Sequence, residues 1–178
     1  MNFEPIVEKI RTDIGSRDAV PGFDPENGNQ KAKFLFLLEA PGPKAVVSKC
    51  ISMNNPDPTA RNFKKQIELA QISKGEIAIW NVVPWYIGKE ENSYKKIRAA
   101  KTTDIEQGVT YLSEIINKMP NLKCIVLVGE KARKAHVALS KITTARILSC
   151  HHPSGQSMNG KPEKHQDNID VFHFMSSQ

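Results

Sequence analysis

Residues 33–39 read Lys-Phe-Leu-Phe-Leu-Leu-Glu, a continuous apolar run with a charged residue at each end. A run of this length is typical of a strand buried on both faces, because such a strand has no solvent side that requires alternating polar residues. Further strands are predicted at residues 76–83, 123–128 and 146–150, separated by segments with helical spacing of apolar residues. This alternation predicts right-handed crossovers and a three-layer α/β/α sandwich around a central four-stranded parallel sheet.

The predicted helices begin at residue types that favour helix starts. Asp57 followed by Pro58 indicates an N-cap and a proline at the first helical position. Thr103 with Glu106 resembles a capping box. The remaining helices are predicted over residues 2–14, 130–142 and 162–176.

Composition narrows the class of protein. The 178 residues include 25 Lys and Arg against 19 Asp and Glu, and the net charge of +6 permits nucleic acid as a partner without requiring it. No apolar run is long enough to span a bilayer, and the N-terminus has no apolar export signal. Three cysteines without a CxxC spacing favour a reducing compartment. We therefore expect one domain over residues 1–178, cytoplasmic and, without a coiled-coil pattern, monomeric.

Two connections, residues 40–56 and 84–102, are longer than this architecture needs. Each follows the carboxyl end of a predicted strand, where open α/β sheets bind their ligands, and loops beyond about 15 residues usually carry function. Polar residues follow the strands at the same edge, namely Glu39, Asn81 and His152. We expect these side chains to meet around one crevice.

Several common chemistries find no support in the sequence. There is no glycine-rich phosphate cradle, and residues 128–131 indicate only a strand-to-helix turn. Cys150, His151 and His152 lack a recognised ligand spacing, and adjacent residues of an extended chain point to opposite sides, so we expect neither a metal nor a cofactor. Cys150 is expected to be a buried strand cysteine rather than a nucleophile.

Each remaining polar residue has a structural explanation beside the functional one. Glu39 either orients water at a pocket floor or accepts from backbone N–H groups in the following turn. The Asn81 amide either binds the edge of a base or belongs to turn chemistry. His152, held before a proline, either stabilises an anion or is a partly exposed loop histidine. Their shared position at one edge of the sheet favours the functional interpretation.

Four segments resemble the motifs of the uracil-DNA glycosylase superfamily, in the family's order and spacing. Residues 38–43, Leu-Glu-Ala-Pro-Gly-Pro, resemble its first motif in the GEAPG form of the iron–sulfur branch. Residues 81–86, Asn-Val-Val-Pro-Trp-Tyr, resemble the central motif whose asparagine contacts the base. Residues 124–132 resemble the third strand and its turn, and residues 152–155, His-Pro-Ser-Gly, resemble the HPS motif. The similarity covers about residues 23–159 and implies the same four-stranded fold.

The resemblance implies a DNA glycosylase that hydrolyses the N-glycosidic bond of uracil or another deaminated base, as in base excision repair. His152 would donate a hydrogen bond to the base and stabilise the anion that develops on it. Asn81 would bind the Watson–Crick edge of the base. Glu39 would position or deprotonate the attacking water. The base must leave the helix stack to reach such a pocket.

The rest of the implied DNA-binding surface depends on the neighbouring turns. Ala40, Pro41 and Gly42 would shape the base pocket, and Ser154 would bind a flanking phosphate. Met158 is the apolar candidate for a wedge that fills the vacated stack, against the alternative that its loop is a flexible tip. The basic candidates for phosphate contacts are Lys44, Lys49, Lys131, Arg133 and Lys161.

The chain departs from the family pattern in identifiable ways. The four cluster cysteines of the iron–sulfur branch are absent, so no cluster is expected. Ala40 stands where members with the GQDPYH motif place an aspartate, so either Glu39 substitutes for it or activity is lost. The aromatic that stacks on the base is Phe63, Trp85 or Tyr86, with Phe63 expected in the core. Two rival hypotheses are a non-catalytic DNA- or nucleotide-binding protein of the same fold and a hydrolase of free nucleosides.

Overall fold

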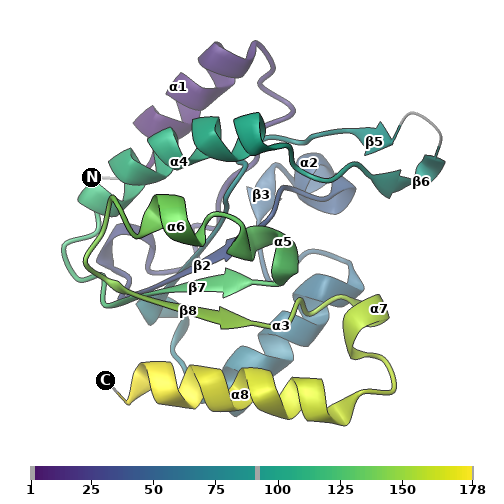
Figure 1. Ribbon diagram of the computed structural model, residues 1–178, viewed down its shortest axis with the longest axis vertical. Helices are drawn as coiled ribbons and strands as arrows, with labels where there is room; N and C mark the ends of the chain where they lie inside the picture. Colours follow the sequence, from purple (N-terminus) through teal and green to yellow (C-terminus); the bar gives the residue numbers. More distant parts are fainter. Residues whose placement is uncertain (1–2, 91–92, 178) are drawn as a thin grey trace.

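The apolar runs form one four-stranded parallel sheet in the computed structural model, which describes residues 3–90 and 93–177 (Figure 1). The strands are β2 (Phe34–Leu38), β4 (Ile77–Asn81), β7 (Cys124–Val128) and β8 (Arg146–Cys150), in the order β4-β2-β7-β8. The central strands β2 and β7 are buried along almost their whole length, which explains their continuous apolar sequences. The predicted parallel sheet is confirmed.

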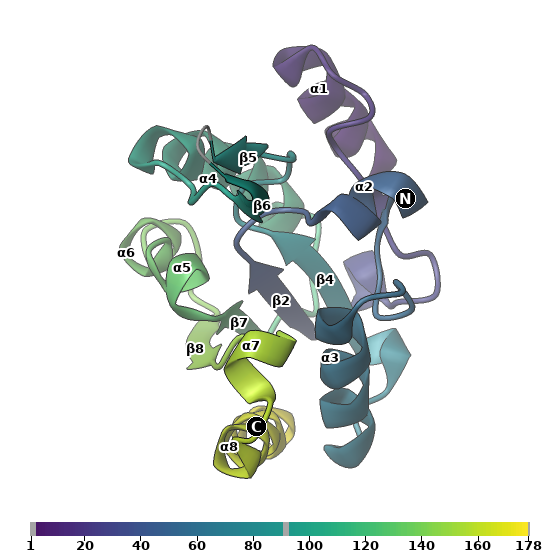
Figure 2. The same cartoon turned by 90° about the vertical axis from the view of Figure 1, so that its right-hand side faces the viewer.

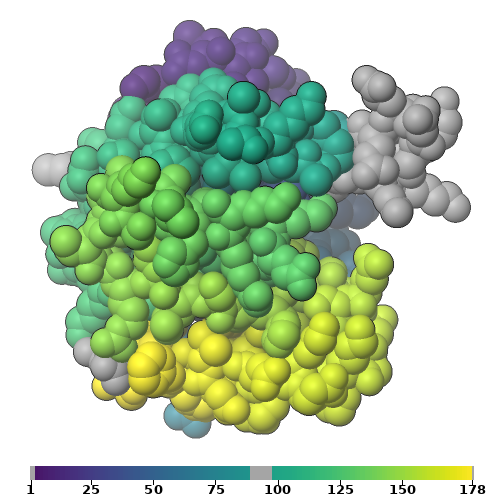
Figure 3. Space-filling view, viewed as in Figure 1, coloured from purple at the N-terminus to yellow at the C-terminus, as the bar shows by residue number. Residues whose placement is uncertain are grey.

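Helices cover both faces of this sheet (Figures 1 and 2). One face carries α4 (Thr102–Asn117), α5 (Glu130–Arg133) and α6 (His136–Leu139), and α1 (Glu4–Ile14) packs against α4. The other face carries α3 (Pro58–Leu69) and α8 (Pro162–Ser176), which contact each other. Figure 3 shows α4 in teal, α5 and α6 in green and α8 in yellow, stacked along one side of the molecule. The predicted three-layer arrangement is confirmed.

The core between the sheet and α3 and α8 is built around three phenylalanine rings. Phe36 on β2, Phe63 on α3 and Phe172 on α8 meet edge to face, with ring centroids 5.1 to 6.0 Å apart. All three are at most 4% exposed. Such edge-to-face contacts fix the two helices against the strand as well as removing apolar surface from water.

The two long connections contain ordered elements. Residues 40–56 include α2 (Pro43–Ser48) and β3 (Cys50–Ile51), which pairs with β1 (Gly22–Phe23). Residues 84–102 include an antiparallel hairpin of β5 (Lys89–Glu90) and β6 (Ser93–Ile97), which extends beyond the carboxyl ends of the sheet strands (Figure 1). Three short helical segments complete the described chain: η1 (Asn29–Lys31), η2 (Lys74–Glu76) and α7 (Gly155–Met158).

One predicted helix start is confirmed and another is wrong. The Asp57 carboxylate accepts a hydrogen bond at 3.0 Å from the N–H three residues further on, as an N-cap does. The predicted box of Thr103 and Glu106 does not form, because the N-cap lies two residues earlier, at Lys101. Asp104 instead accepts from the backbone N–H of Lys101 at 2.8 Å, and α4 begins at Thr102.

The predicted helix over residues 130–142 is also wrong in detail, because it is divided into α5 and α6. Between them, the N–H groups of Lys134 and Ala135 bond to the carbonyl three residues back, which tightens the chain into a 3₁₀-type turn. The closing helix over residues 162–176 is confirmed by α8. In the described part of the chain, every helix is too short or too polar to cross a bilayer.

Candidate active site

The carboxyl ends of the four strands lie at one edge of the sheet (Figure 2), and the predicted polar residues lie at or directly after these ends. Leu38 pairs with Asn81 in the register of β2 and β4, so Glu39 emerges beside the end of β4. Gly129 follows β7, and His152 lies two residues after the end of β8. Neighbouring strands lie about 4.8 Å apart, so these residues follow the ends of adjacent strands along one edge.

Glu39 is held by two donors from different parts of the chain. Its Oε1 accepts a hydrogen bond from the backbone N–H of Ala100 at 2.8 Å, and its Oε2 lies 3.3 Å from the Lys131 ammonium. The side chain is 18% exposed. A carboxylate pinned at both oxygens has a fixed direction, and each oxygen keeps a lone pair for water.

His152 is packed against the turn that follows β7. A Cβ atom on Gly129 would lie 2.8 Å from His152 Cβ, so only a glycine at position 129 allows the histidine to pack this closely. The backbone N–H of Ser154 donates to His152 Nδ1 at 3.2 Å, which places the imidazole proton on Nε2. The ring therefore presents an Nε2–H donor.

Burial sets the charge of this imidazole. It lowers the pKa of His152 below its ordinary value, because the cationic form loses solvation. The Glu39 carboxylate opposes this shift in pKa, the Lys131 ammonium adds to it, and the Asp57 carboxylate opposes it. The lowered pKa favours the neutral form of the ring near neutral pH.

Asn81 is the last residue of β4, and only 3% of it is exposed. Its Oδ1 is buried and finds no hydrogen-bond partner among the described residues. A buried acceptor without a partner costs about 1–3 kcal/mol, so this oxygen requires a water or a ligand as its donor. The amide has an acceptor available for a ligand at the edge where Glu39 lies.

The turn of Ala40, Pro41 and Gly42 leads directly into α2, with Gly42 as its N-cap. A Cβ on Gly42 would meet nothing within 4 Å, so the space beside this turn is open. Ser154 is the N-cap of α7, and its hydroxyl oxygen accepts from the N–H of Ser157 at 3.3 Å. The Ser154 hydroxyl proton stays available to an external acceptor.

The proposed wedge residue is buried in the protein. Met158 is 1% exposed, and its Sδ lies 3.7 Å from Nε2 of Gln66 on α3. The prediction of a wedge at Met158 is wrong, because α7 turns this side chain onto α3. The alternative of a flexible loop tip is also wrong, because residues 155–158 are helical.

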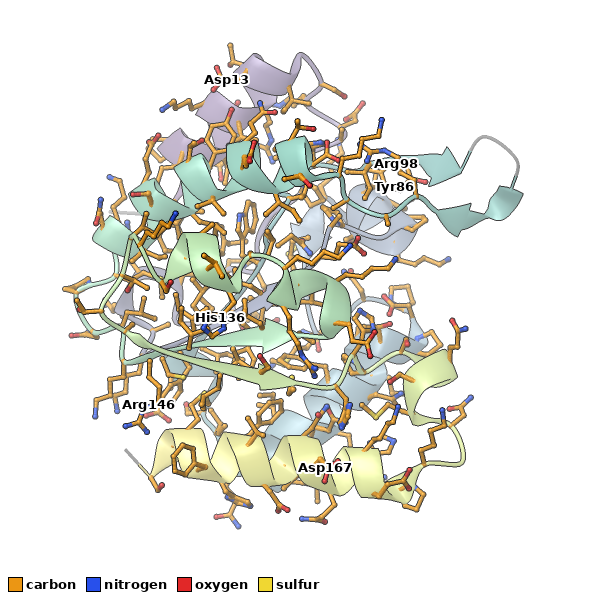
Figure 4. The ribbon with its side chains drawn as sticks, in the orientation of Figure 1. Asp13, Tyr86, Arg98, His136, Arg146 and Asp167 are labelled. Carbon is orange, nitrogen blue, oxygen red and sulfur yellow. The ribbon has the colours of Figure 1, made fainter. Side chains whose placement is uncertain are left out.

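The aromatic candidates separate by burial. Phe63 is in the core, as predicted, and Trp85 is 7% exposed and belongs to the same core. Tyr86 is partly exposed and lies at the approach to the hairpin, where Figure 4 labels it near Arg98. Tyr86 therefore remains the candidate for stacking on a base.

The basic candidates also divide into two groups. Lys131 faces the Glu39 carboxylate within the cluster of polar residues. The other four residues are exposed to solvent: Lys44, Lys49, Arg133 and Lys161. Arg133 also donates from Nη2 to the Cys150 carbonyl oxygen at 3.4 Å.

Two other features of the described chain carry no comparable chemistry. A cavity of about 490 Å³ lies at the opposite edge of the sheet, between the end of α4 and residues 140–145, and its lining includes no His, Cys, Asp or Glu. The strand cysteine Cys150 is 3% exposed, and burial raises its pKa to about 12. The prediction that Cys150 is a buried structural thiol is confirmed.

Two participants were not assigned to this cluster from the sequence. Lys131 is predicted only as a phosphate contact, and Ala100 is not predicted at all, because a backbone N–H leaves no signal in the sequence. Gly129 is predicted at this edge, after the third strand, but without a role. In the structure its φ is +88°, a conformation that other residues rarely adopt.

Comparisons with known proteins concern the family and the fold of the chain. A family model described as the uracil DNA glycosylase superfamily matches residues 25–171. The solution NMR structure of a proposed uracil DNA glycosylase from Methanosarcina acetivorans superimposes with a TM-score of 0.60. It is 17% identical and covers 88% of this chain and 98% of its own, a likeness that concerns the fold. No curated protein matches the chain by sequence. Because the family model spans most of its length, the chain belongs to the uracil DNA glycosylase superfamily.

Proposed function

We propose that this protein is a monofunctional DNA glycosylase that hydrolyses the N-glycosidic bond of uracil, or of another deaminated base, in DNA. The observation that carries the proposal is the Nε2–H donor of His152 at the same edge as the Glu39 carboxylate and the unpartnered Asn81 Oδ1. These three groups match the three demands of the reaction: an anion to stabilise, a base to identify and a water to place.

His152 acts on the leaving base. As the glycosidic bond lengthens, negative charge develops on the base oxygen O2, and Nε2–H donates to it. A neutral donor keeps its proton and so stabilises the anion throughout the step. One such donor in a water-excluded site is worth about 3 kcal/mol, or more than 100-fold in rate.

Asn81 identifies the base through its Watson–Crick edge. The buried Oδ1 accepts from the N3–H of uracil, and Nδ2 donates to O4. Cytosine presents the reverse pattern on this edge, so it leaves the Oδ1 without a donor when the amide is held in this orientation. A site that leaves a buried polar group unpaired against the wrong substrate discriminates strongly.

Glu39 places the water. Positive charge develops on the sugar before water attacks, so orientation contributes more than base strength. The bonds to Ala100 and Lys131 hold the carboxylate still, and its remaining lone pairs accept from a water on the sugar side. Ala40 adds no carboxylate, so this role rests on Glu39 alone.

The test is release of free base from single- and double-stranded oligonucleotides that carry one uracil, hypoxanthine or xanthine. We expect uracil release, an at least 100-fold lower rate for His152→Ala, and a similar loss for Asn81→Ala. His173→Ala, which removes an exposed histidine of α8, is the matched control and should leave the rate unchanged. Unaltered melting temperatures would show that the variants are folded.

Two outcomes would overturn the proposal. Tight binding of uracil-containing DNA without release of any base would identify a non-catalytic member of the fold, which the alanine at position 40 would explain. Release of base from mononucleosides but not from DNA would identify a nucleoside hydrolase.

A further inference from the structure

The segment that carries His152 continues from an exposed edge of the sheet. β8 is the outer strand, and its inner side is paired with β7 up to Cys150. The last bond on that side runs from the N–H of Gly129 to the Cys150 carbonyl oxygen at 2.9 Å. On the outer side no strand of the described chain follows, so another group must fix the backbone before His152.

Asn168 of α8 supplies that group. Its Oδ1 accepts from the backbone N–H of His151 at 2.7 Å, and its Nδ2 donates to the His151 carbonyl oxygen at 3.0 Å. One side-chain amide therefore pairs with both backbone groups of a single residue, as a neighbouring strand would. Asn168 is 1% exposed, so water does not compete for these bonds.

The direction of this amide is fixed by a second buried amide. Nδ2 of Asn168 also donates to Oε1 of Gln66 on α3 at 3.1 Å, which uses both of its protons. Gln66 is 0% exposed, and its own Nε2 lies 3.0 Å from Nδ1 of His165. Reversing either amide would place donor against donor, so the network has one arrangement.

A further asparagine holds the chain on the other side of His152. Nδ2 of Asn62, on α3, donates to the Pro153 carbonyl oxygen at 2.9 Å. The residues before and after His152 are thus each bonded to an asparagine from a different helix. The His151 side chain also contacts α8: its Nε2 lies 3.1 Å from the carboxylate of Asp167, which Figure 4 labels on this helix.

We propose that Asn168 and Asn62 are positioning residues that hold the backbone on both sides of His152 and so fix the direction of its Nε2–H. Neither touches the substrate in the proposed mechanism. The inference rests on the proposed function for its catalytic meaning, but the orientation of the imidazole is measurable by itself.

The first test is NMR spectroscopy of the protein labelled with ¹⁵N in its histidine rings, with the His152 signals identified from a His152→Gln sample. In the unaltered protein we expect Nε2 protonated and Nδ1 unprotonated, with a pKa below about 6.5. In Asn168→Ala and Asn62→Ala the ring should shift toward a mixture of both tautomers, and its pKa should rise toward the ordinary value. Asn62 is partly exposed, so its variant decides the question if Asn168→Ala does not fold.

Two controls on the same helix separate positioning from stability. Gln166→Ala removes only a surface bond to Asp170, and Phe172→Leu weakens the core without touching His151. Both should leave the His152 signals unchanged, although the second lowers the melting temperature. Wild-type signals in both asparagine variants, or an equal shift in Phe172→Leu, would overturn the inference.

The activity measurement keeps the two proposals apart. With uracil-containing DNA, Asn168→Ala and Asn62→Ala should lower kcat about 10- to 100-fold and change KM much less, because they misplace a group that acts in the transition state. If the NMR shifts occur and the unaltered protein releases no base, the proposed function fails and the positioning stands. If the protein is active and the signals do not move, the positioning fails.

Discussion

Replacing Gly129 with alanine perturbs the candidate site through a single added carbon. The new Cβ would lie 2.8 Å from His152 Cβ and 3.2 and 3.3 Å from two ring carbons, whereas ordinary contact begins at 3.4 Å. The histidine must therefore retreat by about 0.6 Å. Gly129 also has φ +88° and ψ 165°, a region used almost only by glycine, where a side chain costs about 1–3 kcal/mol.

The loss of stability and the loss of rate can both be estimated. A loss of about 1–3 kcal/mol in a chain of this length lowers the melting temperature by roughly 2–12 °C. Misplacing a catalytic group by about 1 Å can cost about 100-fold, so a retreat of this size should lower the rate of base release about 10-fold. The measurements are thermal denaturation and single-turnover release of uracil from an oligonucleotide.

Gly15→Ala is the matched control. Gly15 has φ +69° at the end of α1, and a Cβ there would meet nothing within 4 Å. It should lower the melting temperature by a few degrees, at about 1 kcal/mol, and leave the rate of base release unchanged. A Gly129→Ala variant with the rate of the unaltered protein would refute the argument that His152 depends on this close approach.

Three further predictions follow from the charges and caps around the site. Because burial lowers the pKa of His152, the folded state resists protonation of the ring, and the free energy of unfolding should fall as the pH drops below about 6.5. In a pH series of denaturant titrations, the His152→Gln variant should lose less of its free energy of unfolding over the same range. Lys131→Ala removes a cation that lowers the pKa of His152, so an NMR titration should give a higher pKa, and an unchanged or lower value would contradict the arrangement. Asp57→Ala deletes the N-cap of α3 and should cost about 1 kcal/mol, seen as a melting temperature lower by about 2–4 °C, whereas the exposed Asp170→Ala should change it little.

The positions of the strands could be predicted from the sequence, because a strand that is buried on both faces has a continuous run of apolar residues. Residues 34–38 and 124–128 are apolar throughout, and both became central strands. The start of α3 was equally accessible, because Asp57 and Pro58 act within one turn of chain. The start of α4 was not, because Asp104 is also bound to Arg98 at 2.7 Å, a partner that the preceding hairpin brings to it.

Some residues of the candidate site could likewise be predicted from the sequence, and others could not. Glu39, Asn81 and His152 could be chosen from the sequence, because polar residues directly after apolar strands must lie at one edge of a parallel sheet. Their partners could not. The N–H of Ala100 reaches Glu39 across 61 positions of sequence, and Met158 reads as an exposed apolar residue until α7 turns it onto α3.

The amino-acid sequence by itself determined the order of strands and helices, the edge at which polar residues gather and the motifs of the family, because these depend on short-range patterns of burial and on residue type. Only the tertiary structure decided which donor holds Glu39, why position 129 is a glycine and how two helix asparagines hold the chain beside His152. Those are contacts between segments far apart in sequence, and their geometry exists only once the helices have packed on the sheet.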